Sequence, residues 1–368
     1  MRRENIGKDS ASETGKALPT EAALVYCTDE AFLPAACFSI RSVCDVTPRP
    51  PTIFVFVTGL SDAERDKADR YLAGFGADIR IQLVDPNVLR WGRTVPSGSR
   101  AAYLRLHLGH LVPPEYHRAL YLDADTRVMS DLTPLFEKDL GKHTAGACHD
   151  VLAFIGHGGL AERRRDCGLR SDQSYFNSGV MLLDMDRWRR NKVGERAIEF
   201  STTFPERCRY LDQCSLNHVL ADDWTPIDIR WNFSPKLWEH RAPFVRFRPP
   251  PGWVGILHFL TPSKPWHATA ASHHVFHNAW YRSIARSSPW PTFASPVPTL
   301  ACTKAMAVRH LQASRYAIRR SVEAIAPRLL SSRVRRAHSE QRAYFHALLT
   351  NSPSSLPNFF ETTCGNGG

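Results

Sequence analysis

Two aspartates that follow an apolar run have the side-chain type and spacing of a cation site. Asp123 and Asp125 stand directly after the apolar run 119–122 in the segment RALYLDADTRVMSDLTPLF. Where an extended chain leaves a sheet, two carboxylates two residues apart can direct their oxygens to one divalent cation. Such a cation compensates the repulsion between buried like charges, and it usually takes its remaining ligands from the phosphates of a nucleotide.

The same spacing occurs a second time, so the pair alone does not decide the chemistry. Asp184 and Asp186 also follow an apolar run, but they precede RWRRNKVGERAIEF, which has a helical pattern. For that second pair an N-cap role is a sufficient explanation. A two-letter motif of this kind arises by chance about once in a chain of this length. The interpretation of Asp123 and Asp125 therefore depends on the elements that position them.

Short apolar segments alternate with amphipathic ones along the chain. Strands are expected at 24–27, 52–57, 77–84, 119–122, 144–148, 180–183, 226–229 and 255–259. Helices are expected at 61–74, 100–111, 186–204 and 212–220, the first with Ser61 and Glu64 in capping-box spacing. This alternation predicts an α/β domain around a mostly parallel sheet, whose ligands bind beyond the carboxyl ends of the strands. The polar residues at those ends are Asp29, Asp123, Asp150 and His258.

The composition supports a globular body. The chain has 368 residues, of which 43% are hydrophobic, enough for a full core. Residues 1–22 are polar without a signal-peptide core, and no apolar run approaches the ~20 residues of a membrane span, so we expect a cytoplasmic protein. The nine cysteines contain no CxxC pair, which argues against a zinc framework or a disulfide scaffold and favours reduced thiols in the core.

Most of the net charge of +11 lies in one C-terminal segment. Between Arg282 and Arg342 there are twelve lysines or arginines and two acids. A possible helix at 302–325 carries an apolar stripe, which favours an anionic membrane surface as partner. Nucleic acid is a second candidate partner, but no zinc-finger, RRM or KH motif supports it, and a solvated helix without a partner is the third interpretation. We expect a disordered segment 1–22, an α/β domain 23–285, a basic helical extension 286–350 and a disordered tail 351–368.

Seven segments between residues 24 and 267 carry a resemblance to a known family. They are AALVYCTDEAF, AAYLRLHLG, YLDADTRVMSDLTPLF, YFNSGVMLLDMDRWR, LDQCSLN, RWNFSP and HFLTPSKPWH. In this order they resemble the glycosyltransferases of family 8, most closely the lipopolysaccharide branch. The resemblance implies a Rossmann-like nucleotide-binding domain of the GT-A type. It also implies retaining transfer of a hexose from UDP-galactose or UDP-glucose to a saccharide or glycolipid acceptor, such as lipopolysaccharide core, at the inner face of the membrane.

The resemblance also implies roles for individual residues. Asp123, Asp125 and His258 would bind Mn²⁺ or Mg²⁺ on the donor diphosphate. Lys264 would neutralise the diphosphate as it leaves, and Asp212 and Gln213 would lie beside the anomeric carbon. Further positions expected around the nucleotide, the donor sugar and the acceptor are Cys27, Asp29, Arg105, Asp150 and Asn177. For His258, Lys264 and Arg105 the structural alternatives are a core histidine, an exposed loop lysine and a helix-surface ion pair.

Three positions depart from the family pattern: Ala31 replaces a frequent asparagine, Cys214 a frequent acid and Thr261 a frequent glycine. Contacts to the nucleotide, to the donor hydroxyls and in the phosphate loop are less well defined by the sequence for that reason. Whether the acceptor attacks from the leaving-group face, or a carboxylate such as Asp212 first attacks from the other, stays open. A carboxylate-pair glycoside hydrolase and an inactive sugar-nucleotide binder are the competing interpretations of the α/β domain.

Overall fold

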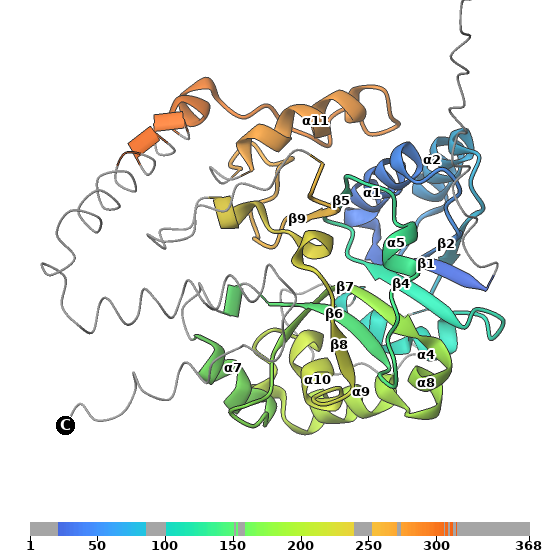
Figure 1. The fold of residues 1–368 in the computed structure, drawn as a ribbon. Helices are drawn as coiled ribbons and strands as arrows, with labels where there is room; N and C mark the ends of the chain where they lie inside the picture. Colours follow the sequence, from blue (N-terminus) through green and yellow to red (C-terminus); the bar gives the residue numbers. More distant parts are fainter. Residues whose placement is uncertain are drawn as a thin grey trace, which may run out of the picture.

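A computed structural model describes residues 21–85, 101–150, 152–153, 159–238, 252–270 and 274–304, with 306–307, 310–311 and 314. The centre of the molecule is a seven-stranded sheet of order β3-β2-β1-β4-β7-β6-β8 (Figure 1). Its strands are β1 (Ala22–Asp29), β2 (Thr52–Thr58), β3 (Ile79–Leu83), β4 (Arg118–Leu122), β6 (Ala145–His149), β7 (Phe176–Asp184) and β8 (Trp224–Pro226). Only β7 runs antiparallel to its neighbours β4 and β6.

The direction of β7 brings its first residues to the edge of the sheet at which the parallel strands end. Because β7 is antiparallel, its amino end lies beside the carboxyl ends of β4 and β6. A second, two-stranded sheet pairs β5 (Thr126–Val128) with β9 (Ile256–His258). It begins a few residues after β4 ends, so it lies at the same edge.

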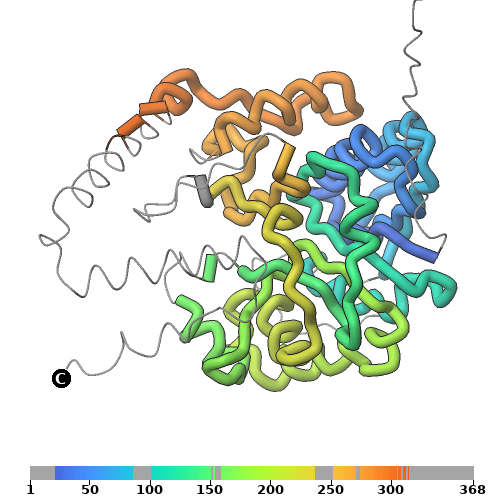
Figure 2. The backbone as a smooth tube through the Cα atoms, in the orientation of Figure 1, coloured from blue at the N-terminus to red at the C-terminus, as the bar shows by residue number. Residues whose placement is uncertain are grey.

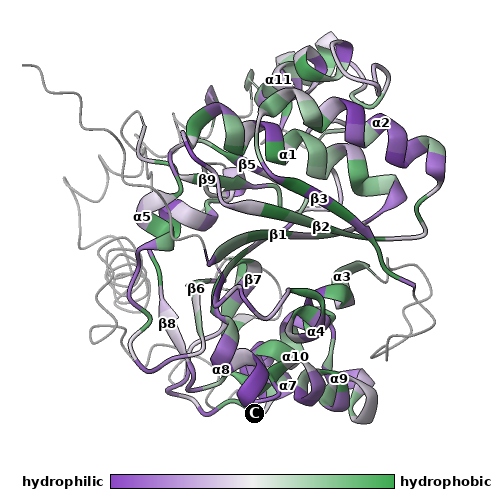
Figure 3. Cartoon of the chain, turned by 90° about the vertical axis from the view of Figure 1, so that its right-hand side faces the viewer, coloured by the Kyte–Doolittle hydropathy of each residue, from purple (hydrophilic) through white to green (hydrophobic). Residues whose placement is uncertain are grey.

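Helices cover both faces of the main sheet (Figure 3). One layer contains α1 (Leu33–Val46), α2 (Asp62–Leu72) and α11 (Val275–Arg286). The other contains α3 (Ala101–Leu104), α4 (Leu108–Leu111), α8 (Met185–Arg190), α9 (Val193–Thr203) and α10 (Asp212–Val219). Shorter helices are α5 (Thr133–Phe136) and α7 (Gly159–Cys167), with 3-10 turns η1 (Glu30–Phe32), η2 (Ala73–Phe75), η3 (Arg105–His107), η4 (Pro205–Arg207), η5 (Ile229–Asn232) and η6 (Pro235–Trp238).

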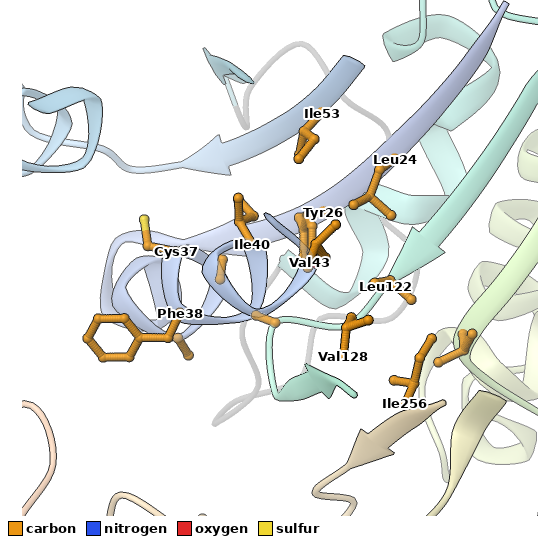
Figure 4. Close-up of a cluster of buried hydrophobic side chains, with 14 of the residues drawn as sticks. Leu24, Tyr26, Cys37, Phe38, Ile40, Val43, Ile53, Leu122, Val128 and Ile256 are labelled. Atoms are coloured by element: carbon orange, nitrogen blue, oxygen red, sulfur yellow. The ribbon is translucent and has the colours of Figure 1, made fainter. Parts of the chain in front are cut away.

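Each face of the sheet has its own apolar core. On the α1 side, Ile40 and Val43 lie toward Leu24 and Tyr26 of β1 (Figure 4). Phe38 belongs to the same cluster, and its ring lies edge-on to Trp290 and Phe293. On the other side, apolar residues of α8 and α9 pack against the opposite faces of the same strands. Strands covered by helices on both faces have continuously apolar sequences instead of alternating apolar and polar residues. β1 and β2 have such continuously apolar sequences.

The segment after the small sheet returns to the amino-terminal helices. Figure 2 shows α11 and the residues after it running beside the helices coloured blue. The indole Nε1 of Trp290 donates a hydrogen bond to Glu64 Oε2 of α2 at 2.7 Å, and its ring lies edge-on to Phe38. Residues as far as Ala294 therefore belong to the core on the α1 side.

The α/β fold predicted from the sequence is confirmed, with corrections at particular elements. In place of the strand expected at 226–229, β8 spans Trp224–Pro226, and the 3-10 turn η5 begins at Ile229. The strand expected at 255–259 pairs with β5 instead of joining the main sheet. The helix expected at 186–204 is two helices, interrupted at Lys192 with a φ of 49°. The helix at 100–111 likewise divides into α3, η3 and α4, and α1 was not predicted.

Other expectations concern caps, cysteines and the ends of the chain. Asp184 caps α8, accepting from Arg187 N–H at 2.8 Å, so the N-cap interpretation of the second aspartate pair is confirmed. None of the eight described cysteines forms a disulfide, and six of them are buried. The segments 1–20 and 315–368, with most of the basic extension, lie outside the described residues. Among the helices that the structure describes, none is long and apolar enough to cross a membrane.

Candidate active site

The end of β4 and the small sheet together place an imidazole beside the aspartate pair. Asp123 directly follows β4, and its backbone N–H donates to Gly179 O of β7 at 2.8 Å. The chain then enters β5, in which Thr126 lies opposite His258 of β9. Phe259 N–H donates to Asp125 O at 3.1 Å, which continues this pairing by one step. The β5–β9 ladder therefore fixes His258 next to two aspartates that are distant in sequence.

Asp123, Asp125 and His258 form a donor set suited to a divalent cation. His258 Nε2 lies 3.2 Å from Asp125 Oδ1 and 3.5 Å from Asp123 Oδ2. One ligand atom from each of the three residues lies within 4.8 Å of the others. Carboxylates suit Mg²⁺ and Mn²⁺, and a single imidazole is also compatible with Mn²⁺. The residues present therefore fit the expected metal.

Cationic side chains keep both aspartates ionised. Burial opposes ionisation of Asp125, but Lys264 and His258 outweigh it and hold the pKa of Asp125 well below its usual range. Burial of Asp123 is likewise outweighed by Arg105 and His258, which lower the pKa of Asp123. Lys264 Nζ lies 2.5 Å from Asp125 Oδ2 and also donates to Phe259 O at 2.6 Å. Two carboxylates are thus ready to bind a cation at neutral pH.

His258 is strongly influenced by the same charges. Burial alone would lower the pKa of His258, but the carboxylates of Asp125 and Asp123 raise it to about 9. The other ring nitrogen, Nδ1, is hydrogen-bonded to Asn232 Oδ1 at 2.8 Å. With 2% of its surface exposed, His258 is nevertheless no apolar core residue, because both ring nitrogens contact polar groups.

Arg105 joins the cation site to Asp212. Its guanidinium lies 2.8 Å from Asp123 Oδ1 and 2.9 Å from Asp212 Oδ2, and it stacks over the Tyr121 ring at 4.5 Å. Arg105 is 6% exposed, so it is not the helix-surface arginine of the structural alternative. Burial raises the pKa of Asp212 to about 6, although Arg105 opposes this effect.

Hydrogen-bonded amides extend from the candidate metal ligand His258 toward α7. Asn232 Nδ2 donates to Asn177 Oδ1 at 2.8 Å, and Asn177 Nδ2 donates to Gln213 Oε1 at 3.1 Å. Gln213 Nε2 then donates to Asp150 Oδ2 at 2.8 Å, which also accepts from Arg163 at 2.6 Å. The predicted residues Asn177, Gln213 and Asp150 are therefore in contact with one another and, through Asn232, with His258.

Cys27 and Asp29 lie at the carboxyl end of β1, next in the sheet to β4. Burial raises the pKa of the Cys27 thiol, with Arg105 opposing this shift, so the thiol stays protonated. The Asp29 carboxylate accepts a hydrogen bond from Phe32 N–H at 3.0 Å and thereby caps η1. These two residues share an edge with the cation site but serve the start of α1 as well.

Three residues of the site were missed by sequence reasoning: Asn232, Gly179 and Arg163. Asn232 and Gly179 stand within RWNFSP and YFNSG, so their segments were noted but not their side-chain positions. Arg163 had no sequence signal, because it lies in a run of three arginines that reads as an exposed helix surface. In the structure Arg163 is 5% exposed and stacks over the Tyr210 ring at 3.8 Å.

The fold and the site define an α/β protein with a cluster of two aspartates and a histidine, suited to a divalent cation, at the carboxyl edge of its sheet. The chain belongs to glycosyltransferase family 8, whose model matches residues 23–270. General stress protein A of Bacillus subtilis is 25% identical over 260 residues, covering 67% of this chain and 86% of that protein. Lipopolysaccharide glucosyltransferase WaaO of Escherichia coli is 26% identical over 281 residues, covering 74% and 79%.

A solved structure shows the same architecture. The galactosyltransferase LgtC, in complex with donor and acceptor sugar analogs, superimposes with a TM-score of 0.62 and 26% identity. The match covers 73% of this chain and 96% of that one. The GT-A-like fold expected from the sequence is therefore confirmed.

Proposed function

We propose that this glycosyltransferase is a metal-dependent, retaining hexosyltransferase that uses UDP-galactose or UDP-glucose. Its acceptor is a saccharide on a lipid-anchored glycan, such as lipopolysaccharide core. Support comes from the likeness to a lipopolysaccharide glucosyltransferase and to a galactosyltransferase bound to sugar analogs. The basic segment after Arg282 supports a location at the inner face of the membrane, because several cations together bind anionic lipid.

The observation that carries the proposal is the meeting of Asp123, Asp125 and His258 with Lys264 beside them. A divalent cation bound there supplies positive charge to the diphosphate that leaves with UDP. Lys264 adds a second positive charge beside the diphosphate, since its ammonium group contacts the Asp125 carboxylate that would also bind the cation. Charge placed before the reaction where negative charge develops is an effective way to lower the barrier.

The side-chain amides of Asn177 and Gln213, here called the sugar-side amides, favour attack by the acceptor on the leaving-group face of the donor sugar. Gln213 Oε1 accepts from the N–H of Ser178 and from Asn177 Nδ2, each at 3.1 Å, so its lone pairs are engaged and it is a poor nucleophile. Asp212 is 3% exposed and paired with Arg105, which also removes nucleophilic character. We therefore assign both residues to orienting the donor sugar, with the acceptor hydroxyl attacking from the side that UDP leaves.

The hydrolase interpretation has less support. A glycoside hydrolase needs one carboxylic acid that holds its proton near neutral pH. Neither Asp123 nor Asp125 does so, because positive neighbours outweigh burial and lower both pKa values. Burial raises the pKa of Asp212 to about 6, but this carboxylate is 3% exposed and paired with Arg105 at 2.9 Å, so it is not free to protonate a leaving group. Their arrangement suits cation binding instead.

The test is release of UDP from a panel of UDP-sugars with and without Mn²⁺. We expect turnover of UDP-galactose or UDP-glucose that depends on metal and increases with a saccharide acceptor. Asp125→Asn removes a ligand charge at nearly constant shape and should abolish this turnover. Metal-independent turnover, or full activity of Asp125→Asn, would contradict the proposal.

Association with membranes is measured separately. Full-length protein should sediment with vesicles containing anionic phospholipid, and the binding should weaken with salt. A chain ending at Pro298 retains Trp290 and the core contacts of α11, and it should stay in the supernatant. Equal sedimentation of both proteins would contradict the membrane assignment without affecting the catalytic one.

A further inference from the structure

Asn232 stands between the cation site and the sugar-side amides, and it contacts both. Its Oδ1 faces His258 Nδ1 at 2.8 Å, and its Nδ2 donates to Asn177 Oδ1 at 2.8 Å. We propose that Asn232 is a positioning residue that fixes the tautomer of His258 and ties the metal ligands to Asn177 and Gln213. This inference rests on the metal-dependent transfer proposed above.

The backbone of β7 determines which way the amides point. Gly179 N–H donates to Asn177 Oδ1 at 3.0 Å, and Ser178 N–H donates to Gln213 Oε1 at 3.1 Å. A backbone N–H can only donate, so each of these side-chain atoms must be the amide oxygen. The orientation of Asn177 is therefore imposed by the strand rather than chosen between two equivalent states.

The orientation of Asn232 follows from that of Asn177. Because Asn177 presents an oxygen, the atom of Asn232 that faces it must be the amide nitrogen. Asn232 then presents its own oxygen to His258, so Nδ1 of the imidazole must carry a hydrogen. In the neutral ring Nε2 is left with a free lone pair, directed at the side of Asp123 and Asp125.

Burial makes this arrangement difficult to replace. Asn232, Asn177 and His258 are 3%, 7% and 2% exposed, so water cannot readily substitute for a lost partner. The backbone also holds Asn232 beside β9, because Phe233 N–H donates to Ile256 O and His258 N–H donates to Phe233 O, both at 2.9 Å. Asn232 is the last residue of η5, whose start is capped by Asp228.

Two substitutions at position 232 separate its two contacts. Asn232→Ala removes both the acceptor for His258 and the donor for Asn177. Asn232→Asp keeps an acceptor for Nδ1 but places an oxygen against the oxygen of Asn177. Loss of a hydrogen-bond partner of a metal-binding histidine typically weakens metal binding by about 10–100-fold.

The experiment measures Mn²⁺ binding to full-length protein by the electron paramagnetic resonance signal of the free ion, without any sugar nucleotide. We expect Asn232→Ala to weaken Mn²⁺ binding by about 10–100-fold. Asn232→Asp should bind Mn²⁺ at least as tightly as the wild type, yet show reduced kcat for UDP release. Asn278→Ala is the matched control, because Asn278 is also buried and its Nδ2 donates to the carbonyls of Pro265 and Ser295 rather than to a residue of the cation site. It should bind Mn²⁺ normally, and thermal unfolding in chelator should verify that each variant is folded.

Two results would overturn the inference: Mn²⁺ affinity of Asn232→Ala equal to that of the wild type, or Asn232→Asp as weak as Asn232→Ala. Wild-type protein that binds Mn²⁺ but turns over no UDP-sugar would contradict only the proposed function, since affinity is read without a donor. Wild-type protein that binds no Mn²⁺ would contradict both.

Discussion

Gly179 lies so close to His258 that a β-carbon at position 179 would be 2.1 Å from the ring carbon Cε1. The same β-carbon would be 2.6 Å from Asp123 Oδ2. Two of the three metal-ligand candidates therefore occupy the space that any other residue at 179 would need. A glycine is required at position 179 by these close contacts and not by its backbone conformation, since its φ is not in the left-handed region.

Gly179→Ala should accordingly damage the cation site. The added methyl group must displace the imidazole or the carboxylate, and overpacking of this kind costs about 1–3 kcal/mol of stability. We expect loss of Mn²⁺ binding, measured by titration, with the protein still folded by circular dichroism. Gly146→Ala in β6 is the matched control, since its β-carbon would meet Leu140 at 2.7 Å, outside the site. That control should lose stability but keep Mn²⁺ affinity, and equal affinity of both variants would contradict the prediction.

Lys264→Ala should separate catalysis from metal binding. The Lys264 ammonium group competes with a metal ion for Asp125, because the two groups already form an ion pair. Its removal should leave Mn²⁺ affinity unchanged or tighter, while UDP release falls by about 100–1,000-fold, as expected when one preorganised charge is lost. Calorimetric Mn²⁺ titration and steady-state kinetics measure the two effects. Weakened Mn²⁺ binding with normal kcat would reverse the assignment of Lys264.

Metal affinity should depend on pH through His258. Burial lowers its pKa, but Asp125 and Asp123 raise it to about 9, so below that pH a metal ion must displace one proton. Mn²⁺ affinity should therefore rise about tenfold per unit between pH 6 and 8. His258→Asn should bind weakly and with a flat pH profile over that range. A flat profile in the wild-type protein would contradict the assignment of His258 as a ligand.

The folding stability of the metal-free protein should fall as the pH rises, whereas the affinity for Mn²⁺ rises. The folded pKa of His258, about 9, lies above its ordinary value of 6.5, so the folded state binds the extra proton. The resulting stability is complete below about pH 6.5 and is lost as the pH rises through about 9. Urea unfolding in chelator at pH 6, 7.5 and 9 should reveal this loss. His258→Asn should lack it, and identical profiles for the two proteins would exclude His258 as the cause.

Arg163→Met should destabilise the protein and disturb Gln213. It leaves Asp150, which is 2% exposed, without its cationic partner, and breaking a buried pair from one side costs about 3–5 kcal/mol. Gln213 shares the same carboxylate oxygen, so kcat should fall as well. The double variant Arg163→Met/Asp150→Asn should recover most of the stability but not the activity. Urea unfolding and UDP release decide this, and additive losses in the double variant would argue against the pairing.

The sequence determined the parts of the site that depend on local order. Apolar runs without polar interruption predicted buried strands, and the aspartates directly after them were placed at the carboxyl edge of the sheet. The capping box at Ser61 predicted where α2 begins, because a helix start depends only on residues within one turn. The family was also legible in the sequence, since its seven segments keep their order and spacing.

Only the tertiary structure decided which distant residues meet. No local pattern specifies that β9 pairs with β5 and not with the main sheet, yet that pairing puts His258 beside Asp125. Arg163 looks like a surface residue in sequence, and a helix-surface ion pair was the structural alternative for Arg105. Both are buried because aspartates from other elements compensate their charge. Contacts between residues far apart in the chain depend on the packing of whole elements, so periodicity and spacing along one segment cannot reveal them.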